Sequence, residues 1–332
     1  MSRKLTKPLP QGIPDTVQVA KHVVEDTVAG FRLDRYIAER LGILSRSQLK
    51  VRKLCARVNG KSVKLSRLVS DGDLLELEWE EPEASFLIPQ KIPLEILYED
   101  SRVVVLNKRQ GMVVHPGAGN KSGTLANALL YRRLSRSNGD GHVPEGFGPE
   151  GFRPGIVHRL DKDTSGVIIA AWDDEALAFL AAQFKERSTR KTYLALTKGV
   201  PPNKSGTIST RLTRDPRDRK RFVCSDMNGK QALSWYKVLE TYGDYALVAL
   251  RPKTGRTHQL RVHLKQLGCP ILGDPIYGRK DQMFPEATLM LHAYLLTIEL
   301  LDGKGARTFK SPVPARFRQV LLRLRQSARW SS

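Results

Sequence analysis

The sequence predicts an α+β protein with a mixed, largely antiparallel central sheet, preceded by a small α/β domain. A length of 332 residues indicates about two domains, each large enough to bury a core. In the C-terminal two thirds, short apolar segments typical of strands follow one another with few helical patterns between them, which disfavours a doubly wound sheet. Residues 81–91 are acidic, contain two prolines and lack periodicity, so we expect a linker there.

The net charge of the chain indicates what kind of partner the protein binds. Lys and Arg number 55 and Asp and Glu 34, which gives a formal net charge of +21. Such an excess points to a polyanion, either a nucleic acid or an anionic membrane surface. No apolar run approaches the roughly 20 residues of a membrane span, and the N-terminal sequence lacks the apolar segment of a signal peptide. The three cysteines show no C-x-x-C spacing, so we expect no disulfide framework, no zinc site and a cytoplasmic location.

The small domain is expected at residues 20–80, after a flexible arm at 1–19 that is rich in Pro and Lys. Leu33, Ile37 and Leu41 have the spacing of one helix face, and Gly42 is placed to end that helix. A second short helix is expected to begin at Ser45 or Ser47 and to carry Leu49 and Leu54.

Strands should complete this domain. Asn59-Gly60 between short extended segments is a strong hairpin signal, and Asp71-Gly72-Asp73 predicts another turn. The alternation of Leu75, Leu77 and Trp79 then indicates a half-buried strand.

The second domain is expected at residues 92–325. Its first clear element is a buried strand at 102–107, and a Gly- and Pro-rich segment at 134–155 predicts a long loop. Further strands are expected at 167–171, 192–197, 233–239, 245–250 and 295–300, with helices at 125–130, 175–185, 258–267 and 317–330. The sequence contains no glycine-rich phosphate loop, which disfavours a nucleotide hydrolase.

The densest polar segment is 158–166, which ends where the apolar strand at 167–171 begins. Asp161 lies there between Arg159 and Lys162, and a neighbouring cation favours the ionised carboxylate that a nucleophile or a base requires. The composition alone leaves this function and a solvated turn capped by Asp161 about equally favoured.

A second polar cluster spans residues 253–263. Thr257, Arg261 and Lys265 share one helix face, so Arg261 is placed either to meet an anion or carboxylate or to form an ordinary exposed salt bridge. His258 and His263 are five residues apart, which is not the spacing of a helical metal site, so His258 is expected to be structural or to contact RNA.

Two further features leave alternatives open. Tyr193 begins a strand among cations; a core position is favoured for it, and stacking on a nucleobase is the functional alternative. The loop 115–120 either contacts a phosphate through its backbone amides or is a connecting turn.

These segments carry a resemblance to a known family. His158-Arg159-Leu160-Asp161 followed by Thr164-Ser165-Gly166 resembles the signature of the large-subunit ribosomal RNA pseudouridine synthases of the RluA/RluD type. Tyr193, the segment Gly255–Arg261 and the segment Gly273-Asp274-Pro275-Ile276-Tyr277-Gly278 follow in the order expected for that family. The likeness covers roughly residues 92–320. The small basic domain resembles an RNA-binding domain shared with a small-subunit ribosomal protein, although Leu54-Cys55-Ala56 departs from its usual pattern.

The resemblance implies a pseudouridine synthase fold and an isomerase that converts uridines of large-subunit ribosomal RNA to pseudouridine. The implied catalytic residues are Asp161, Tyr193 as the ring on the target base, and Arg261 as the salt-bridge partner of Asp161. The implied substrate-binding residues are Arg159, His158, Arg256, His258 and Thr164. The implied RNA-binding residues of the small domain are Arg32, Arg35, Arg46, Ser47, Lys50, Lys53, Arg57 and Asn59.

The implied reaction breaks and remakes one bond within the RNA, so it needs no cofactor and no metal. The expected partner is ribosomal RNA or a pre-ribosomal particle, with the protein acting as a monomer and away from membranes. The alternative function is a non-catalytic RNA-binding factor of ribosome assembly. A binding factor would tolerate Asp161→Asn, whereas an enzyme would lose turnover.

Overall fold

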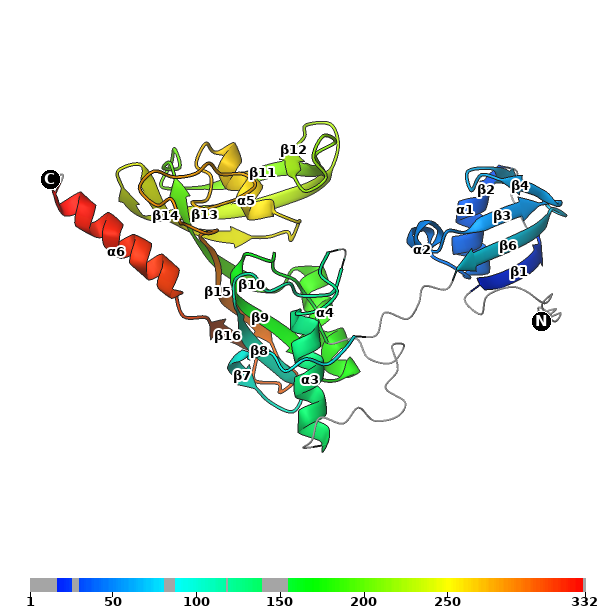
Figure 1. Cartoon of the computed structure of the whole chain (residues 1–332), viewed down its shortest axis with the longest axis horizontal. Helices are drawn as coiled ribbons and strands as arrows, with labels where there is room; N and C mark the ends of the chain where they lie inside the picture. The colour runs from blue at the N-terminus through cyan, green and yellow to red at the C-terminus, as the bar shows by residue number, and fades with distance from the viewer. Residues whose placement is uncertain (1–16, 26–29, 81–86, 118, 139–154, 331–332) are drawn as a thin grey trace. The chain divides into compact units, whose positions relative to one another are not determined.

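The computed structural model describes residues 17–25, 30–80, 87–117, 119–138 and 155–330, and the chain divides into two units, Met1–Phe86 and Leu87–Ser332 (Figure 1). The second unit begins inside the segment 81–91 that we expected to be a linker. Asn127 Nδ2 donates to the carbonyl oxygen of Ile88 over 2.8 Å, which ties this part of the segment to the second unit. None of the helices in the described part of the chain has the length and apolar character that a membrane span requires.

The first unit is built on a four-stranded antiparallel sheet in the order β1-β6-β3-β4. Its strands are β1 (Val17–Val23), β6 (Leu74–Glu80), β3 (Cys55–Val58) and β4 (Lys61–Val63), and β2 (Phe31–Arg32) pairs with β5 (Leu68–Val69) in a second small sheet. The structure corrects the expected arm at 1–19, because β1 already pairs with β6 from Val17 onward. This edge strand has no strict apolar alternation, which hid it from sequence reasoning. Residues 1–16 of the arm lie outside the described residues.

The helices of the first unit follow the predicted pattern. α1 (Leu33–Arg35) continues as the π-helical segment η1 (Tyr36–Leu41), and Gly42 ends it in the left-handed conformation with φ +64°. α2 (Arg46–Val51) follows Ser45, whose N–H donates to Gln48 Oε1 over 2.7 Å. Leu54 was expected on this helix and instead lies just before β3, buried in the core of the unit.

The second unit is built on one ten-stranded sheet, and the mixed, largely antiparallel sheet expected from the sequence is confirmed. Its order is β12-β11-β13-β14-β10-β15-β9-β8-β7, with β16 paired to β15. Only the β9–β15 pairing is parallel within the described sheet. The strands are β7 (Glu95–Glu99), β8 (Val103–Lys108), β9 (Ser165–Ala171), β10 (Arg190–Lys198), β11 (Ser205–Arg214), β12 (Phe222–Cys224), β13 (Lys230–Tyr242), β14 (Tyr245–Pro252), β15 (Leu291–Glu299) and β16 (Ala306–Lys310).

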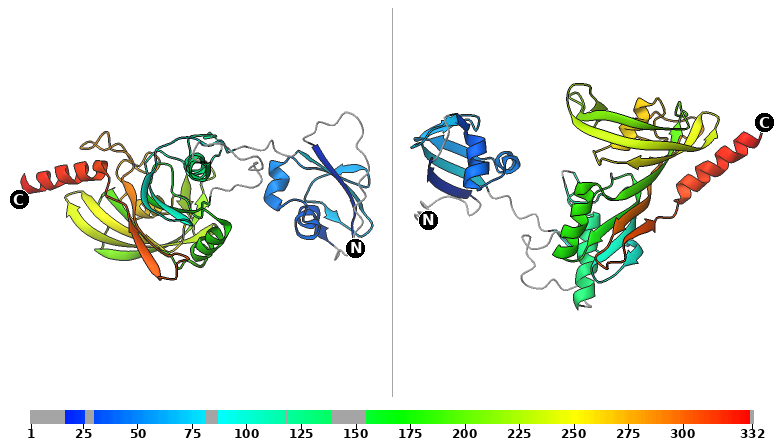
Figure 2. Two further views of the ribbon diagram at one scale, coloured as in Figure 1. Left: turned by 90° about the horizontal axis from the view of Figure 1, so that it is seen from below. Right: turned by 180° about the vertical axis from the view of Figure 1, so that it is seen from behind.

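The strands β8 and β9 are buried on both faces, as their continuous apolar runs predict. Alternate residues of these strands, such as Val103 and Val105, pack with α4 (Asp174–Glu186), and the others, such as Val104 and Leu106, pack with α3 (Leu125–Asn138). Figures 1 and 2 show both helices against this half of the sheet. The helix α3 occupies the first residues of the long loop expected at 134–155, and residues 139–154 lie outside the described part of the chain.

Two helices complete the other half of the sheet. α5 (Gln259–Gln266) and α6 (Ala315–Trp330) both contribute to the apolar cluster that covers β10, β13 and β14. The predicted packing of α6 is confirmed, because Phe317, Val320, Leu321 and Leu324 are buried.

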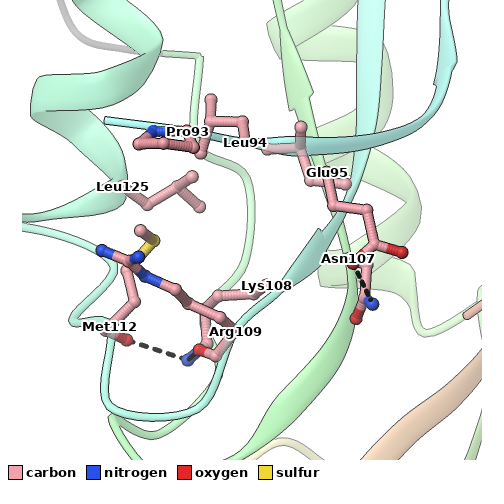
Figure 3. Close-up of a pocket in the computed structure, with 9 residues that line it drawn as sticks. Pro93, Leu94, Glu95, Asn107, Lys108, Arg109, Met112 and Leu125 are labelled. Atoms are coloured by element: carbon pink, nitrogen blue, oxygen red, sulfur yellow. Dashed lines mark hydrogen bonds between the residues drawn. The ribbon is translucent and has the colours of Figure 1, made fainter. Parts of the chain in front are cut away.

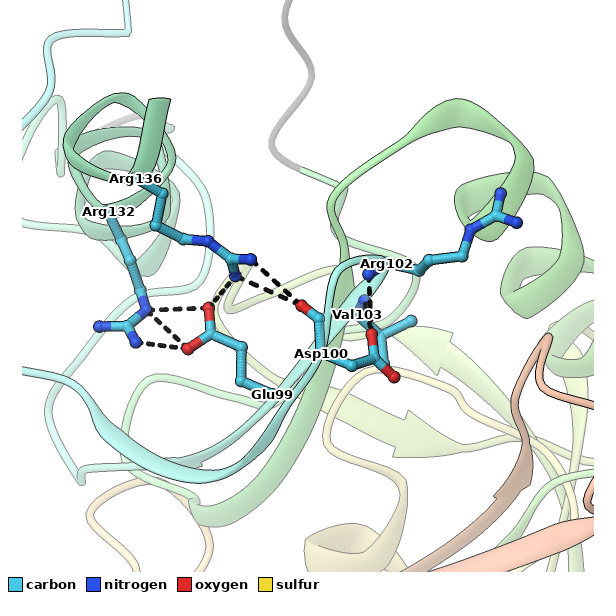
Figure 4. Close-up of polar contacts among 6 residues, drawn as sticks. All are labelled: Glu99, Asp100, Arg102, Val103, Arg132 and Arg136. Atoms are coloured by element: carbon cyan, nitrogen blue, oxygen red, sulfur yellow. Dashed lines mark hydrogen bonds and ion pairs between the residues drawn. The ribbon is translucent and has the colours of Figure 1, made fainter. Parts of the chain in front are cut away.

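An ionic contact joins the edge strand β7 to α3 (Figure 4). Glu99 accepts hydrogen bonds from Arg132 and Arg136, which are four residues apart on the helix, and Arg136 also donates to the carbonyl oxygen of Asp100. Burial alone would raise the pKa of Glu99, but the two guanidinium groups outweigh it and hold that pKa below its ordinary value. The contact therefore supports the edge of the sheet with an ionised carboxylate.

The close approach of β9 to β15 generates a stability prediction. A Cβ at Gly166 would lie 2.1 Å from the carbonyl oxygen of Ala293, and the φ of Gly166 is +118°. We expect Gly166→Ala to lower the free energy of unfolding by more than about 3 kcal/mol, because the backbone strain of the substitution is joined by a clash with another strand. Urea denaturation measures the effect.

The matched control is Gly305→Ala, because Gly305 has a φ of +73° but no atom within 4 Å of its Cβ position. We expect this control to cost about 1 kcal/mol. Equal losses for the two variants would contradict the close approach of the strands.

Candidate active site

The site begins in the loop that precedes β9. The backbone N–H of Thr164 donates to the carbonyl oxygen of Asp161 over 3.1 Å, which closes a turn, and Leu160 is buried on the α3 side of the sheet. The side chain of Asp161 remains 22% exposed. The turn therefore presents one partly open carboxylate at the start of a fully buried strand.

The buried side chain of Lys108 supports this loop. Lys108 is 2% exposed, and its ammonium donates to the carbonyl oxygens of Met112, Arg109 and Lys162 over 2.8, 3.1 and 3.1 Å. Burial lowers the pKa of Lys108 to about 8, although the negative charges of Asp161 and Asp163 oppose that shift. Lys108 thus ties the loop after β8 to the loop that carries Asp161.

A pocket of about 340 Å³ opens beside Lys108 (Figure 3). Its lining residues are Pro93, Leu94, Glu95, Leu106, Asn107, Lys108, Arg109, Met112 and Leu125. Asp161, Tyr193 and Arg261 do not line it, so the pocket is separate from the residues that the sequence singled out.

The register of the sheet brings Tyr193 to the loop of Asp161. Ala293 of β15 pairs with Gly166 of β9 on one side and with Tyr193 of β10 on the other. A β-bulge between Thr192 and Tyr193 interrupts the regular alternation at this point and so re-aims the side chain. Burial raises the pKa of Tyr193, and the charge of Asp161 adds to the effect, so the phenol stays neutral. Tyr193 also packs against two apolar clusters, so its ring is partly a core group, as the favoured interpretation of the sequence predicted.

The buried guanidinium of Arg261 connects two carboxylates. Nε and Nη2 of Arg261 donate to Asp274 over 2.8 and 2.6 Å, whereas Nη1 lies 3.8 Å from Oδ2 of Asp161. Burial alone would raise the pKa of Asp274, but the hydrogen bonds from Arg261 and from the N–H groups of Ile276 and Tyr277 hold it below its usual range. The sequence left open an exposed salt bridge for Arg261, and the structure instead places this residue in a buried one.

Tyr277 and His258 form the wall next to this pair. The guanidinium carbon of Arg261 lies 5.1 Å from the centre of the Tyr277 ring. The Tyr277 hydroxyl is 2.9 Å from Nδ1 of His258 and accepts from the N–H of Phe222 over 2.8 Å. His258 has a φ of +57° immediately before α5, and burial lowers the pKa of its ring. His258 is therefore a neutral group at the edge of the site.

Three of the other predicted substrate-binding residues lie near the site in different settings. Arg159 is exposed two residues before Asp161, and its side chain has no ion pair or hydrogen bond with another described residue. Thr164 is buried in the turn, and Nε of Arg256 donates to the carbonyl oxygen of Gln231 over 3.1 Å.

His158 is placed differently from the expectation that it binds substrate. Its ring stacks on Phe184 of α4 with 4.4 Å between the ring centres, and its Nε2 accepts from the N–H of Ile169. Burial lowers the pKa of His158 to about 3, so the ring is uncharged. We reassign His158 to packing between β9 and α4. The loop 115–120 likewise closes on itself, because Gly117 and Asn120 exchange backbone hydrogen bonds over 3.0 and 3.1 Å, which favours the connecting turn.

In the first unit, most of the predicted RNA-binding cations are exposed and already paired. Arg32 and Arg46 both form salt bridges with Asp34. Arg35 forms one with Glu39, and Lys53 forms one with Glu80. Arg57 is exposed on β3, and the side chains of Ser47 and Lys50 are outside the described set.

The structure argues against a free RNA contact for Asn59. Its Nδ2 donates to Asp73 and its Oδ1 accepts from the N–H of Leu74, so the amide holds the turn between β3 and β4. The φ of Asn59 is +51°, as such a turn requires.

Sequence reasoning missed two members of the site. Asp274 was quoted within a motif but received no role, and its position between Gly273 and Pro275 was the signal that could have found it. Lys108 gave no usable signal, because a lysine at the end of an apolar strand usually reaches solvent. Together the assigned residues place a partly open carboxylate beside a fixed cation and an aromatic ring, a combination that offers a reactive group and a surface on which an unstacked base can lie.

Comparisons with known proteins agree with this chemistry. A sequence profile described as RNA pseudouridylate synthase matches residues 102–266. The chain is 46% identical over 293 residues to "Ribosomal large subunit pseudouridine synthase D" of Borreliella burgdorferi, covering 86% of this chain and 87% of that one. It is 40% identical over 266 residues to the protein of the same name from Zymomonas mobilis, covering 77% and 80% of the two chains. The solved structure "Human RNA Pseudouridylate Synthase Domain Containing 4" is similar to it with a TM-score of 0.55 at 29% identity, covering 70% of this chain and 93% of that one.

The Arg261–Asp274 pair generates a prediction for stability and its pH dependence. We expect Asp274→Asn to cost about 3–5 kcal/mol at neutral pH, because a buried guanidinium loses its counter-charge. The pKa of Asp274 is lowered in the folded state, so its contribution is full above the ordinary Asp value of about 4 and is lost as the pH falls through the lower folded value. The difference between wild type and variant should therefore shrink as the medium becomes more acidic. Denaturant unfolding at several pH values measures it.

The control for this prediction is Asp244→Asn. The carboxylate of Asp244 is 82% exposed and lies 3.5 Å from Lys198, so we expect a cost below about 1 kcal/mol. A loss at Asp274 that is no larger than the loss at Asp244 would contradict the assigned pair.

Proposed function

Because the chain belongs to the RNA pseudouridylate synthase family, we propose that it isomerises specific uridines of large-subunit ribosomal RNA to pseudouridine, with Asp161 as the catalytic group. The observation that carries this proposal is the contact between Asp161 and the buried guanidinium of Arg261, with Tyr193 brought to the same loop by the sheet. The ribosomal target is supported by the names of the relatives from B. burgdorferi and Z. mobilis.

The reaction is an isomerisation within one nucleotide. The bond between the ribose and the ring nitrogen breaks, the uracil turns, and a new bond joins the ribose to carbon 5 of the ring. The atoms of substrate and product are the same, so no group is supplied from outside. Asp161 acts on the ribose, either as the nucleophile or as the base that removes its proton, and both routes begin with an ionised carboxylate.

Arg261 and Tyr193 support the reaction of that carboxylate in different ways. Arg261 is held by Asp274 through two hydrogen bonds, so its remaining nitrogen Nη1 stays directed at Asp161 and stabilises its negative charge. Tyr193 offers an aromatic surface for the turned uracil. Arg159 is exposed next to Asp161 and is suited to fill the space that the target nucleotide leaves in the RNA.

Further residues are proposed to hold the RNA. Thr164 of the catalytic loop, His258 beside Tyr277, and Arg256 two residues before His258 are proposed to contact the nucleotides around the target. The paired cations of the first unit are proposed to bind RNA phosphates, because exposed ion pairs contribute less than about 1 kcal/mol and exchange readily for another anion. We further propose a cytoplasmic monomer that acts on ribosomal RNA or a pre-ribosomal particle.

The central prediction concerns Asp161. We expect Asp161→Asn to lower the rate of pseudouridine formation at least about 100-fold and to leave RNA affinity within about twofold, because the substitution removes the reacting charge and keeps the shape. Pseudouridine mapping of large-subunit rRNA from cells that lack the protein, complemented with either version, measures activity and identifies the target uridines.

The control is Asp163→Asn, two residues further along the same loop, which should restore the modified sites. Restoration of the same sites by Asp161→Asn would reject the catalytic assignment. An unchanged map in cells without the protein would reject large-subunit rRNA as the substrate.

A second prediction concerns Tyr193. We expect Tyr193→Phe to keep RNA affinity within about twofold because the ring remains, and Tyr193→Ala to weaken binding about tenfold, in the range of about 1–3 kcal/mol for one stacked base. Fluorescence titration with an RNA fragment that contains a target uridine measures both. Equal affinity of the two variants would show that the ring does not stack on the base.

A further inference from the structure

The hairpin of β11 and β12 lies against the site through α5. Phe222 of β12 packs with Val262 of α5 and with Tyr277 in a small apolar cluster. The N–H of Phe222 also donates to the Tyr277 hydroxyl, which the His258 ring contacts from the other side. Figure 1 shows the hairpin next to α5 at one end of the sheet. The hairpin is thereby tied to the same wall that holds Arg261.

The turn of this hairpin is strongly basic. Residues 214–221 read RDPRDRKR, which is five cations and two carboxylates. The two carboxylates are used by the turn itself, because Asp215 accepts from the N–H of Arg217 and Asp218 from the N–H of Lys220, each over 2.9 Å. Within the described residues, none of the five cations forms an ion pair. This contrasts with Arg32, Arg35, Arg46 and Lys53 of the first unit, each of which forms an ion pair.

Arg221 is the member of this turn that points back to the site. Its Nε is buried and has no hydrogen-bond partner within the described residues. Its guanidinium carbon lies 5.9 Å from the centre of the Tyr277 ring, and that of Arg261 lies 5.1 Å from the same centre. Arg221 and Arg261 therefore both lie against the Tyr277 ring, and Arg261 is the residue that contacts Asp161.

We propose that Arg221 binds a backbone phosphate of the RNA next to the target uridine, with the outer cations of the 214–221 turn following the strand outward. The proposal rests on the proposed function, since a nucleotide that leaves its stack to reach Asp161 brings its own phosphates to the rim of the site. A guanidinium suits this ligand, because its planar set of donors matches two phosphate oxygens. The outer nitrogens of the half-buried Arg221 side chain form no hydrogen bond or ion pair within the described residues, so they supply those donors.

The charge of the turn favours a nucleic acid backbone over a protein carboxylate as the ligand. Five cations along eight residues match a polymer with a regular series of charges, and binding such a polymer releases counterions. Contacts of this kind set the position of an RNA without reading its sequence. Arg221 is therefore assigned to positioning the target nucleotide.

The test uses the full-length protein and a large-subunit rRNA fragment that contains a uridine converted by the wild type. Affinity is measured as a function of salt for Arg221→Met and Arg221→Lys, each combined with Asp161→Asn to prevent turnover. Arg221→Met keeps a long stem on the Tyr277 ring and removes the charge, so we expect a Kd about tenfold higher. We also expect the slope of log K against log salt to fall by about 0.7, the value for one phosphate on a single strand. Arg221→Lys should keep most of the slope.

The matched control is Arg318→Met, since Arg318 is exposed on α6 and belongs neither to the site nor to the turn. It should leave both Kd and slope unchanged. An Arg221→Met protein with wild-type Kd and slope would overturn the proposal. A higher Kd with an unchanged slope and a lower melting temperature would also overturn it, because that result describes packing alone.

The outcome for Arg221 is separable from the outcome for the reaction. If the wild type binds large-subunit rRNA fragments but forms no pseudouridine in any of them, the proposed function fails, and the titrations are run on a fragment that the wild type binds. The salt slope of Arg221→Met still decides whether Arg221 contacts a phosphate. In a wild type that does form pseudouridine, a loss of kcat/KM for Arg221→Met that disappears at low salt supports the contact independently.

Discussion

The arrangement of the site depends on one buried ion pair, that of Arg261 with Asp274. A charge taken out of water is tolerated only when its hydrogen bonds are satisfied, and Asp274 reaches this condition with two bonds from Arg261 and two from backbone amides. The pair uses Nε and Nη2 of the guanidinium and leaves Nη1, which is the nitrogen that faces Asp161. The turn that carries Asp274 needs Gly273 at φ +71°, where a Cβ would lie 2.3 Å from the carbonyl oxygen of Thr288. A lysine in place of Arg261 has one charged nitrogen and could not serve both carboxylates in this way.

Much of this fold follows from local sequence signals. The buried strands β8 and β9, the turn at Asn59 and Gly60, and the apolar face of α6 were all predicted, because each depends on residues close together in the chain. β1 and the extent of α3 were not predicted, since an edge strand needs no strict alternation and the helix runs into a polar segment. The candidate site divides in the same way. Asp161, Tyr193 and Arg261 stood out in sequence, whereas the partner of Arg261, the burial of Lys108 and the packing of His158 depend on contacts with distant segments.

Lys108 shows how an unusual position for a charge organises a loop. Three carbonyl oxygens from two loops meet at its ammonium, and a backbone N–H, that of Gly111, reaches the same Lys162 oxygen. The Met112 oxygen is a buried acceptor, and the Lys108 ammonium satisfies it. The loop of Asp161 is thus held from the β8 side by Lys108 and from the β15 side by the pairing of Ala293 with Gly166. The position of the Asp161 carboxylate therefore depends on residues of the sheet, Lys108 and Ala293, and not only on the loop itself.

The proposed contacts between the paired cations of the first unit and RNA phosphates have a consequence for product release. Uridine and pseudouridine are isomers, so the RNA leaves with the same backbone charge with which it arrived, and phosphate contacts hold both equally well. When an RNA phosphate replaces Glu39 at Arg35 or Glu80 at Lys53, the gain in binding free energy is small, because one anion replaces another. Such contacts give short residence times on modified and unmodified RNA alike. The enzyme is then free to leave the RNA after each reaction.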